Sequence, residues 1–594
     1  MRHVSTSGDV TTIAGSPGVP GGADGSGVAA RFDTPSGIAI LATGALIVSD
    51  RENHAIRRGV PTNGATATLT VTRAGTGQGS VESLPAGIAC GADCSDTLPP
   101  GTLVSLTATA ALGSVFTGWS GGGCTATALC VTAVGAATTV TATFAVAPPP
   151  TYTRFLAEGA TSGFFDTRIA LLNPTDTATT ATLSFLKAGA TPIVTQVAVG
   201  ARTRVTVDPK LIAGLAVAEF ATRVESSVPL VVDRTLSWDV ASGYGAHAET
   251  AVAAPSLTWY LAEGATHSGF NLFYLLQNPN PEPAFVDVRY LRPSGDPLVK
   301  TYILAPDSRT NIWVNVEEFD GLGTALASTD VSAVFEVTNG QPIIVERALY
   351  LDRGGVTFAA GHESAGVTTP ATDWFLAEGA TGDYFDLFIL VANPNPTETL
   401  IEETYLLPDG TTVERSHMVP GNSRMNIWVD VEDPRLANTA VSTTITSVYG
   451  EPIIVERALW WPGGFSDWYE AHNSPGAVAT GTRWALAEGE VGGGRNTDTY
   501  ILIANTATVQ GQVRATLLFE DGTTAERTFD VAAKSRFNVD VRSEFPSADG
   551  RRFGAVIESL GRMPIQIVVE RAMYWNAIGQ TWASGTNALA TRLQ

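Results

Sequence analysis

The feature that most constrains this chain is a sequence unit that occurs four times in its C-terminal three quarters. Each copy opens on Leu-Ala-Glu-Gly, with the Leu at positions 156, 261, 376 and 486, so the spacings are 105, 115 and 110 residues. Self-similarity at a nearly fixed period indicates a tandem array of like domains. We therefore expect four repeats: repeat 1 (151–254), repeat 2 (257–368), repeat 3 (372–480) and repeat 4 (482–594).

Hydrophobic patterning within the repeats predicts strands. The apolar runs Phe273–Leu276 and Phe388–Ala392 are followed by Asn-Pro, where proline ends a ladder. Alternating stretches surround glycine turns such as Pro408-Asp409-Gly410. No copy contains a convincing amphipathic helix. Seven or eight strands per unit predict an all-β fold of four tandem immunoglobulin-like β-sandwiches, which we expect to form an extended array.

Charged residues recur in the repeats and suggest ion pairs that fix the strands. In Ile343–Arg347, alternation places Arg347 on the face of Ile343 and its neighbour Glu346 on the opposite face. One charge must therefore lie on an apolar face and needs a partner. We expect structural ion pairs built from Glu263, Arg347, Glu378 and Arg457, with Glu263 or Glu378 as the partner of Arg347.

A histidine follows the acidic-Arg strand in three repeats, at His247, His362 and His472. A Glu with a His can form an acid–base or metal-binding pair, so hydrolysis by the repeats is one hypothesis, with Glu378 and His472 as the residues to test. The fourth copy has no equivalent His. We therefore favour a structural role and predict neither a catalytic residue, nor a metal ligand, nor a cofactor.

The stretch 460–469 is the most ligand-like part of the repeats. It joins Trp460, Trp461, Trp468 and Tyr469 through a glycine-rich segment. Aromatic side chains of this kind can stack on sugars or anchor a protein partner. The alternative is that they pack between repeats, and both interpretations remain open from the sequence.

The four cysteines lie within one short stretch, at Cys90, Cys94, Cys124 and Cys130. Four cysteines allow three pairings. The spacing lacks the two-residue knuckles of a structural zinc site, and no histidine lies among them, so disulfides are favoured over a metal. The local pairs Cys90–Cys94 and Cys124–Cys130 are the preferred pairing.

Two segments before the repeats resemble known families. Residues 1–62 contain Thr12–Gly15, Ala30–Phe32, Pro35–Ala39 and Asp50-x-x-Asn53-His54, and they resemble an incomplete blade of an NHL-type β-propeller. Asp50, Asn53 and His54 are expected to form turn hydrogen bonds. Residues 66–147 contain Gly75-x-Gly77-x-Gly79, Pro85-x-Gly87 and Phe116-x-Gly118-Trp119. They are similar to the divergent internalin B-type bacterial repeat, which implies a small all-β module with Trp119 in its core.

The repeats themselves resemble extracellular bacterial tandem repeats marked by Leu-Ala-Glu-Gly-Ala-Thr, a resemblance that implies a location and no activity. Disulfides favour an extracellular or cell-surface protein, whereas the first ten residues are not a secretory signal. We therefore expect the chain to be an N-terminally truncated fragment.

Composition excludes some partners and leaves the main functional alternatives open. The net charge of -22 makes binding to nucleic acid or an anionic membrane improbable, and no apolar run is long enough for membrane insertion. The leading hypothesis is a non-catalytic adhesive or structural scaffold that contacts surface glycans or proteins. The alternative is an accessory region of a larger secreted enzyme. The oligomeric state is not predicted.

Overall fold

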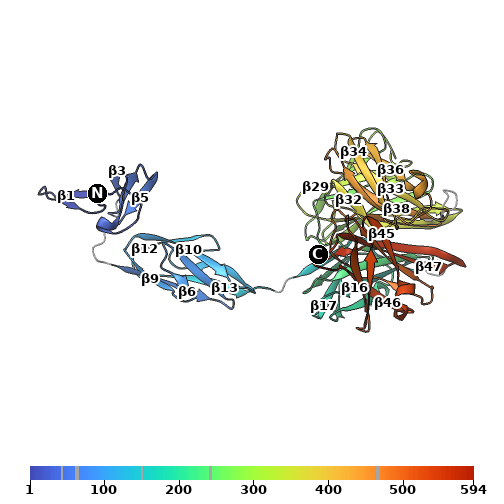
Figure 1. Ribbon diagram of the computed structural model, residues 1–594, viewed down its shortest axis with the longest axis horizontal. Coiled ribbons are helices and arrows are strands. Elements are labelled where there is room, and N and C mark those ends of the chain that lie inside the picture. Colours follow the sequence, from blue (N-terminus) through green and yellow to red (C-terminus); the bar gives the residue numbers. More distant parts are fainter. Residues whose placement is uncertain (42–43, 61–65, 149–150, 240–243, 463–467) are drawn as a thin grey trace. The chain divides into compact units, whose positions relative to one another are not determined.

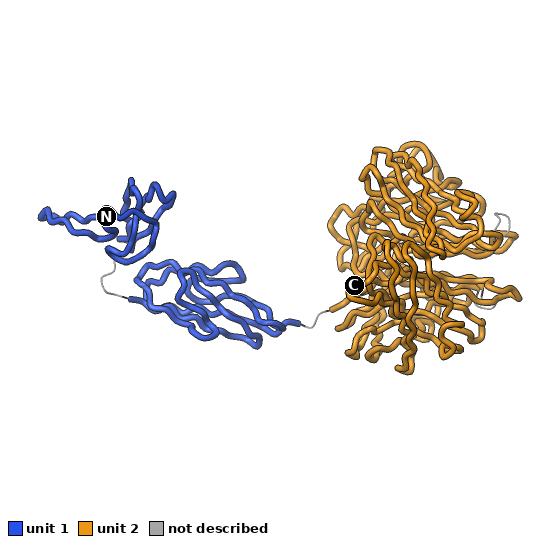
Figure 2. Tube along the Cα trace, in the orientation of Figure 1, with its two compact units in different colours: residues 1–149 blue, residues 150–594 orange. Residues whose placement is uncertain are grey.

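A computed structural model describes the chain except residues 42–43, 61–65, 149–150, 240–243 and 463–467. It contains two compact units, Met1–Pro149 and Pro150–Gln594 (Figure 2). The all-β class is confirmed. The one α-helix in the described part, α1 (Val541–Glu544), has four residues, and no helix there could cross a bilayer.

The N-terminal segment forms small antiparallel sheets. β1 (Arg2–Val4) pairs with β2 (Val10–Thr12), and β3 (Pro35–Ile40), β4 (Leu46–Asp50) and β5 (Ala55–Gly59) form one three-stranded sheet. Asp50 accepts hydrogen bonds from Asn53 Nδ2 (2.9 Å) and the Asp33 amide (2.7 Å). These contacts are the turn hydrogen bonds expected at this point. Residues 42–43, between β3 and β4, lie outside the described residues.

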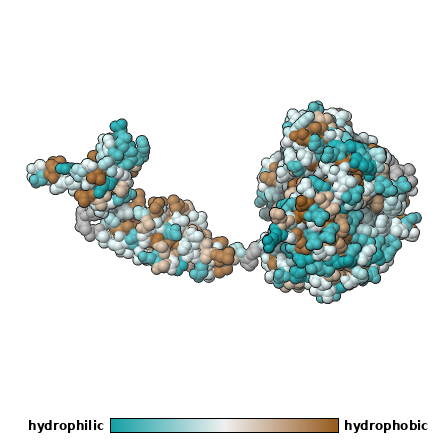
Figure 3. Space-filling view, in the orientation of Figure 1, coloured by the Kyte–Doolittle hydropathy of each residue, from teal (hydrophilic) through white to brown (hydrophobic). Residues whose placement is uncertain are grey.

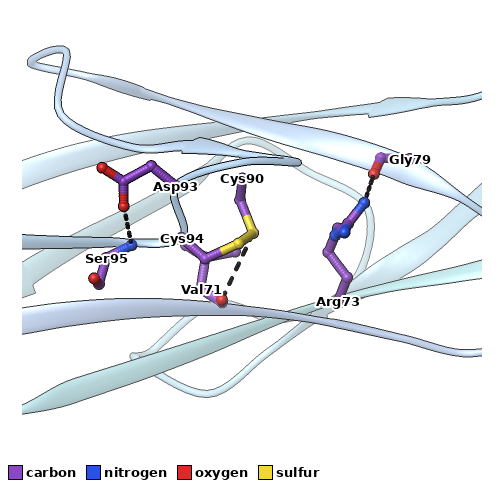
Figure 4. The surroundings of a disulfide bond; sticks show 7 residues. All are labelled: Val71, Arg73, Gly79, Cys90, Asp93, Cys94 and Ser95. Carbon is purple, nitrogen blue, oxygen red and sulfur yellow. Dashed lines mark hydrogen bonds between the residues drawn. A yellow bond between two sulfur atoms is a disulfide. The ribbon is translucent and has the colours of Figure 1, made fainter.

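The cysteine-containing module is a sandwich of two four-stranded sheets. One sheet has the order β12-β10-β7-β8 and the other β11-β13-β6-β9. These strands are β6 (Ala67–Ala74), β7 (Gly79–Leu84), β8 (Ala89–Cys90), β9 (Ser95–Leu98), β10 (Thr102–Ala110), β11 (Ser114–Ser120), β12 (Cys130–Val134) and β13 (Thr138–Val146). The disulfides join Cys90 to Cys94 (Figure 4) and Cys124 to Cys130, the preferred pairing. Trp119 is 6% exposed and contacts Phe116 in the core.

Each of the four repeats contributes eight main strands. Those of repeat 1 are β14 (Tyr152–Leu156), β16 (Phe165–Asn173), β17 (Thr179–Leu186), β18 (Ile193–Val199), β19 (Thr203–Val207), β21 (Ala221–Ser226), β22 (Val231–Trp238) and β23 (Ala246–Thr250). Those of repeat 2 are β24 (Thr258–Leu261), β25 (Phe270–Asn278), β26 (Ala284–Leu291), β27 (Leu298–Leu304), β28 (Ser308–Trp313), β29 (Ser332–Val337), β30 (Ile344–Arg353) and β31 (Val356–Ala365).

Repeats 3 and 4 follow the same plan. Repeat 3 has β32 (Asp373–Leu376), β33 (Asp386–Asn393), β34 (Thr399–Leu406), β35 (Thr412–Val419), β36 (Ser423–Trp428), β37 (Ser442–Ser447), β38 (Ile454–Trp461) and β39 (Glu470–Pro475). Repeat 4 has β40 (Arg483–Leu486), β42 (Asp498–Asn505), β43 (Gly511–Phe519), β44 (Thr524–Val531), β45 (Ser535–Asp540), β46 (Arg551–Ser559), β47 (Ile567–Ala577) and β48 (Gln580–Leu589).

The strand order differs from that of an immunoglobulin domain. In repeat 1 the sheets are β14-β21-β17-β18 and β19-β16-β22-β23, and repeats 2 and 3 have the same order. The first strand therefore pairs with the sixth main strand, whereas in an immunoglobulin domain it pairs with the second. Period-two patterning predicts a sandwich, but it does not identify which strands become neighbours.

The mid-repeat Asn ends a strand and holds the turn that follows it. Asn393 is fully buried, and its Nδ2 donates to the carbonyls of Thr397 (2.8 Å) and Val419 (3.2 Å). The equivalent bonds form at Asn173, Asn278 and Asn505. A buried amide satisfied by two carbonyls explains why Asn recurs at this position in all four repeats.

The four sandwiches do not form the extended array that we expected; they close into a cycle. β23 lies against β31 and β48, and β39 lies against the same two strands. In Figure 1 the yellow and orange repeats 2 and 3 lie in one half of this unit and the green and red repeats 1 and 4 in the other. Hydrophobic residues on the visible surface form small groups among hydrophilic ones (Figure 3). A repeat period cannot distinguish an open array from a closed one.

A single carboxylate contacts all four repeats at the centre of this cycle. Glu470, fully buried in repeat 3, accepts hydrogen bonds from Ser584 Oγ of repeat 4 (2.9 Å), the Ala246 amide of repeat 1 (3.3 Å) and the Gly361 amide of repeat 2 (3.4 Å). Burial raises the pKa of Glu470 well above its usual range.

Candidate functional site

The same backbone contact joins each repeat to the next. The Ala157 and Glu158 amides of repeat 1 donate to Glu346 of repeat 2, both at 2.8 Å. The Ala262, Ala377 and Ala487 amides donate in the same way to Glu456 (2.6 Å), Glu570 (2.8 Å) and Asp233 (2.8 Å). The last of these contacts runs from repeat 4 back to repeat 1 and closes the cycle.

Buried arginines form ion pairs across all four interfaces, and between repeats 4 and 1 the guanidinium of Arg204 lies 3.8 Å from Glu488. Arg347 contacts Glu263 of its own repeat (3.1 Å) and Glu456 of repeat 3 (2.6 Å). Arg457 contacts Glu378 (3.0 Å) and Glu570 of repeat 4 (2.8 Å). Of the two partners considered for Arg347, the structure therefore places Glu263 beside it and Glu378 beside Arg457. Glu456, the second partner of Arg347, was not predicted from the sequence, although it occupies the same position of its repeat as Glu346.

Each histidine faces the Glu of its own Leu-Ala-Glu-Gly segment. Nε2 of His247, His362 and His472 lies 3.4, 3.2 and 3.4 Å from Glu158, Glu263 and Glu378. Burial lowers the pKa of His247 well below its usual value, and it also lowers the pKa of His472. These three pairs are almost completely buried, as a structural role requires.

Aromatic side chains fill the outer part of two interfaces. Between repeats 1 and 2, Trp238 Nε1 donates to the Phe358 carbonyl (2.7 Å), and Tyr350 stacks on Phe358 with 4.3 Å between ring centroids. Between repeats 3 and 4, Trp461 Nε1 donates to the Trp582 carbonyl (2.9 Å), and Tyr574 stacks on Trp582. Trp461 therefore packs between repeats, which was one of the two interpretations of the aromatic stretch.

The interface between repeats 2 and 3 contains a cavity of about 470 Å³. In every repeat, one residue stands four positions after the Arg of the acidic-Arg strand. These residues are Trp238, Leu351, Trp461 and Trp575. Leu351 thus occupies the place that Trp fills at the two closed interfaces, and the smaller side chain leaves space. Trp460 and Trp468 stack in the wall of this cavity, with centroids 4.9 Å apart. Tyr469 does not line it; its amide donates to the Trp461 carbonyl (2.9 Å), and residues 463–467 lie outside the described residues.

This cavity, which we call the repeat 2–3 pocket, is lined by both aromatic and polar residues. The aromatic residues are Phe270, Phe388, Trp460 and Trp468, and the polar residues include His267, Asp330, Arg424 and Asn426. Arg424 is held by the Gly264 carbonyl (2.7 Å) and Asp330 (3.3 Å). A mainly apolar lining with a few fixed polar groups is typical of small-molecule sites.

A second, smaller cavity lies between repeats 4 and 1. It measures about 230 Å³ and is lined mainly by polar and charged residues, including Arg168, Glu490, Arg495 and Arg552. Ser237 stands here where Tyr350, Trp460 and Tyr574 stand in the other repeats. Neither cavity was predicted from the sequence, although the replacements by Leu351 and Ser237 are visible when the four copies are aligned.

Comparisons with known proteins assign the two N-terminal segments. Residues 67–148 match the "Divergent InlB B-repeat domain" family. Residues 32–58 match the NHL repeat. Both resemblances found in the sequence are confirmed. Repeat domains of these kinds, with the disulfides, fit a modular protein with a scaffold or binding role and are consistent with an extracellular location.

No curated protein matches the chain. Among solved structures, Thermotoga maritima 1070 is 14% identical and covers 19% of this chain and 96% of that chain, with a TM-score of 0.17. The Anabaena sensory rhodopsin transducer is 19% identical and covers 15% and 85%, with a TM-score of 0.13. A tetra-tandem repeat in the extending region of a large adhesion protein is 10% identical and covers 71% and 93%, with a TM-score of 0.09.

Proposed function

We propose that the chain is a non-catalytic secreted or cell-surface scaffold that binds a glycan in the repeat 2–3 pocket. The observation that carries this proposal is the replacement of an interface Trp by Leu351, which opens a cavity beside the stacked Trp460 and Trp468. Sugar rings combine apolar faces with hydroxyl groups. The aromatic residues of the pocket together with His267, Asp330 and Asn426 offer both kinds of contact.

The closed cycle supports the scaffold part of this proposal. Its polar interfaces hold the four repeats as one body, so a ligand would bind a preformed site and would not have to order it. A rigid site loses less conformational entropy on binding than a flexible one. The buried His–Glu pairs support the non-catalytic part, because the same pair recurs at three interfaces in strand-fixing contacts.

We predict that Leu351→Trp abolishes glycan binding by filling the pocket with the residue found at the closed interfaces. The full chain would be screened on a glycan array, and the affinity of a retained glycan would be measured by calorimetry. Trp468→Ala should weaken binding by about 5-fold to 150-fold, the equivalent of about 1–3 kcal/mol for the loss of one aromatic stacking contact.

Ser237→Tyr is the matched control for this experiment. It places the residue of sister repeats into the smaller cavity between repeats 4 and 1, and it should leave binding by the repeat 2–3 pocket unchanged. Retention of glycan by Leu351→Trp at the affinity of the unmodified chain, or the absence of any glycan ligand, would overturn the proposal.

A further inference from the structure

The interface between repeats 1 and 2 carries two buried carboxylates that the sister interfaces lack. Glu249 stands where repeats 2 and 3 have Ser364 and Ser474. Glu363 stands where repeats 3 and 4 have Asn473 and Asn587. Both acids are almost completely buried, with 5% and 1% of their surface exposed. Residues at the interface between repeats 1 and 2 can therefore be compared with those at the same positions of the sister interfaces.

At Glu363 a hydrogen-bond donor has been replaced by an acceptor. Between repeats 2 and 3, Asn473 Nδ2 donates to Glu263 Oε2 at 2.8 Å. At the equivalent place between repeats 1 and 2, the carboxylate of Glu363 faces Glu158. Among the described residues, neither Glu158 Oε2 nor Glu363 Oε1 has a hydrogen-bond partner. Two facing carboxylates in a buried site repel each other unless positive charge or a proton compensates them, and the Arg234 guanidinium, which contacts both, supplies one positive charge.

The charges at this interface do not balance as they do at its sisters. Between repeats 2 and 3, Arg347 lies between two carboxylates, Glu263 and Glu456. Between repeats 1 and 2, the corresponding Arg234 contacts Glu158, Glu346 and Glu363, and Glu249 accepts the Ala365 amide nearby (2.7 Å). Four carboxylates thus surround one guanidinium. With its two carboxylates ionised, the sister interface has a net charge of -1. The interface between repeats 1 and 2, with four ionised carboxylates, would need two more positive charges to reach the same net charge.

We propose that Glu158, His247 and Glu363 bind one divalent transition-metal cation of the Zn²⁺ type. One ligand atom from each of these residues lies within 4.8 Å of the others, and His247 Nε2 is 3.4 Å from Glu158 Oε2. All three side chains are at least 95% buried. A set of one imidazole and two carboxylates suits Zn²⁺ and related metals, whereas Mg²⁺ and Ca²⁺ prefer oxygen ligands only.

The test uses the full chain after chelator treatment and dialysis. Calorimetric titration with Zn²⁺ should show one tight site per chain, and Co²⁺ should give the visible absorption bands of a nitrogen- and oxygen-ligated site. Glu363→Asn should weaken Zn²⁺ binding at least 100-fold. This variant introduces the residue that sister interfaces already hold at the same position, so we expect it to fold.

Glu249→Ser is the matched control, because it removes the other additional carboxylate without removing a ligand. It should retain the single Zn²⁺ site, and thermal unfolding followed by circular dichroism would verify that both variants fold. The proposal fails if the chelated chain takes up no stoichiometric Zn²⁺, or if Glu363→Asn binds Zn²⁺ as tightly as the unmodified chain. Either result would mean that Glu158, His247 and Glu363 do not hold a divalent cation together.

Discussion

Arg347→Ala should lower the free energy of unfolding of residues 151–594 by about 3–5 kcal/mol, the usual cost of removing one partner from a buried ion pair. Arg347 is fully buried, and its guanidinium contacts Glu263 (3.1 Å), Glu456 (2.6 Å) and Ser364 Oγ (2.7 Å). Alanine would leave the carboxylates of repeats 2 and 3 facing each other without a cation. The decrease in the free energy of unfolding should therefore far exceed the net stabilisation that the removed contacts provide.

Chemical denaturation followed by tryptophan fluorescence measures this effect. Arg435→Ala is the matched control, since Arg435 pairs with Asp433 (2.9 Å) but has a side chain that is 56% exposed. Exposed pairs contribute about 0–1 kcal/mol. Combining Arg347→Met with Glu456→Gln should recover part of the loss, because one of the two carboxylates that lose the guanidinium is then neutral. Equal effects of Arg347→Ala and Arg435→Ala would contradict the framework of buried ion pairs.

The ion-pair framework shows how far sequence reasoning reaches in this chain. Alternation along β30 correctly indicates that Arg347 needs a partner, because a charge placed on an apolar face must be compensated. The repeated Glu of Leu-Ala-Glu-Gly was a natural candidate, and Glu263 indeed lies beside Arg347. The second partner, Glu456, belongs to the next repeat, and it meets Arg347 only because the sandwiches pack closely.

Closure of the cycle could not be predicted from the repeat pattern. It depends on the Ala487 amide reaching Asp233, residues 254 positions apart, and an open array would show the same four copies. The strand that carries Asp233 differs from its sister strands at three positions of the closing interface: Asp233 replaces Glu, Thr235 replaces Ala and Ser237 replaces an aromatic residue. The geometry between repeats is decided by the packing of β23, β31, β39 and β48, not by any local signal.

The aromatic stretch illustrates a different limit. Trp460 and Trp461 are adjacent in the sequence, which suggests a single aromatic ligand-binding patch. Successive residues of a strand, however, point to opposite faces. Trp460 therefore lines the repeat 2–3 pocket, whereas Trp461 packs against Tyr574 of repeat 4. The sequence contained this information in the strand period. What it did not contain is that both faces of β38 border another repeat.

Residues 151–594 should be less stable at pH 8 than at pH 5 in chelator-containing buffer. Burial raises the pKa of Glu158 to about 7 and that of Glu249 to about 8, from an ordinary value of 4.5. Arg234 and Arg309 oppose the shift at Glu158, whereas Glu346 adds to it. Below pH 4.5 both groups are protonated in the folded and the unfolded chain. Their contribution to the free energy of unfolding is then at its most favourable value.

Between pH 4.5 and the raised pKa values, the unfolded chain releases these protons and the folded chain retains them. Stability then falls as pH rises, by about 1.4 kcal/mol per pH unit for each group concerned. Glu378 does not contribute in this range. Burial acts to raise its pKa as well, but His472 and Arg457 outweigh burial and hold it at about 2. Its contribution is lost only in stronger acid.

Glu249→Ser isolates one of the two groups. The variant should lose the part of the pH dependence that comes from Glu249. At pH 8 its free energy of unfolding should exceed that of the unmodified chain by more than about 1.4 kcal/mol, because position 249 then holds no buried carboxyl group that ionises. Glu402→Ser, at an exposed position of β34, should leave the pH profile unchanged. Denaturant unfolding at half-unit steps from pH 5 to pH 8 would measure all three proteins. A flat profile for the unmodified chain would mean that the interface between repeats 1 and 2 opens to water, since only hydration of Glu158 and Glu249 would return both pKa values to the ordinary range.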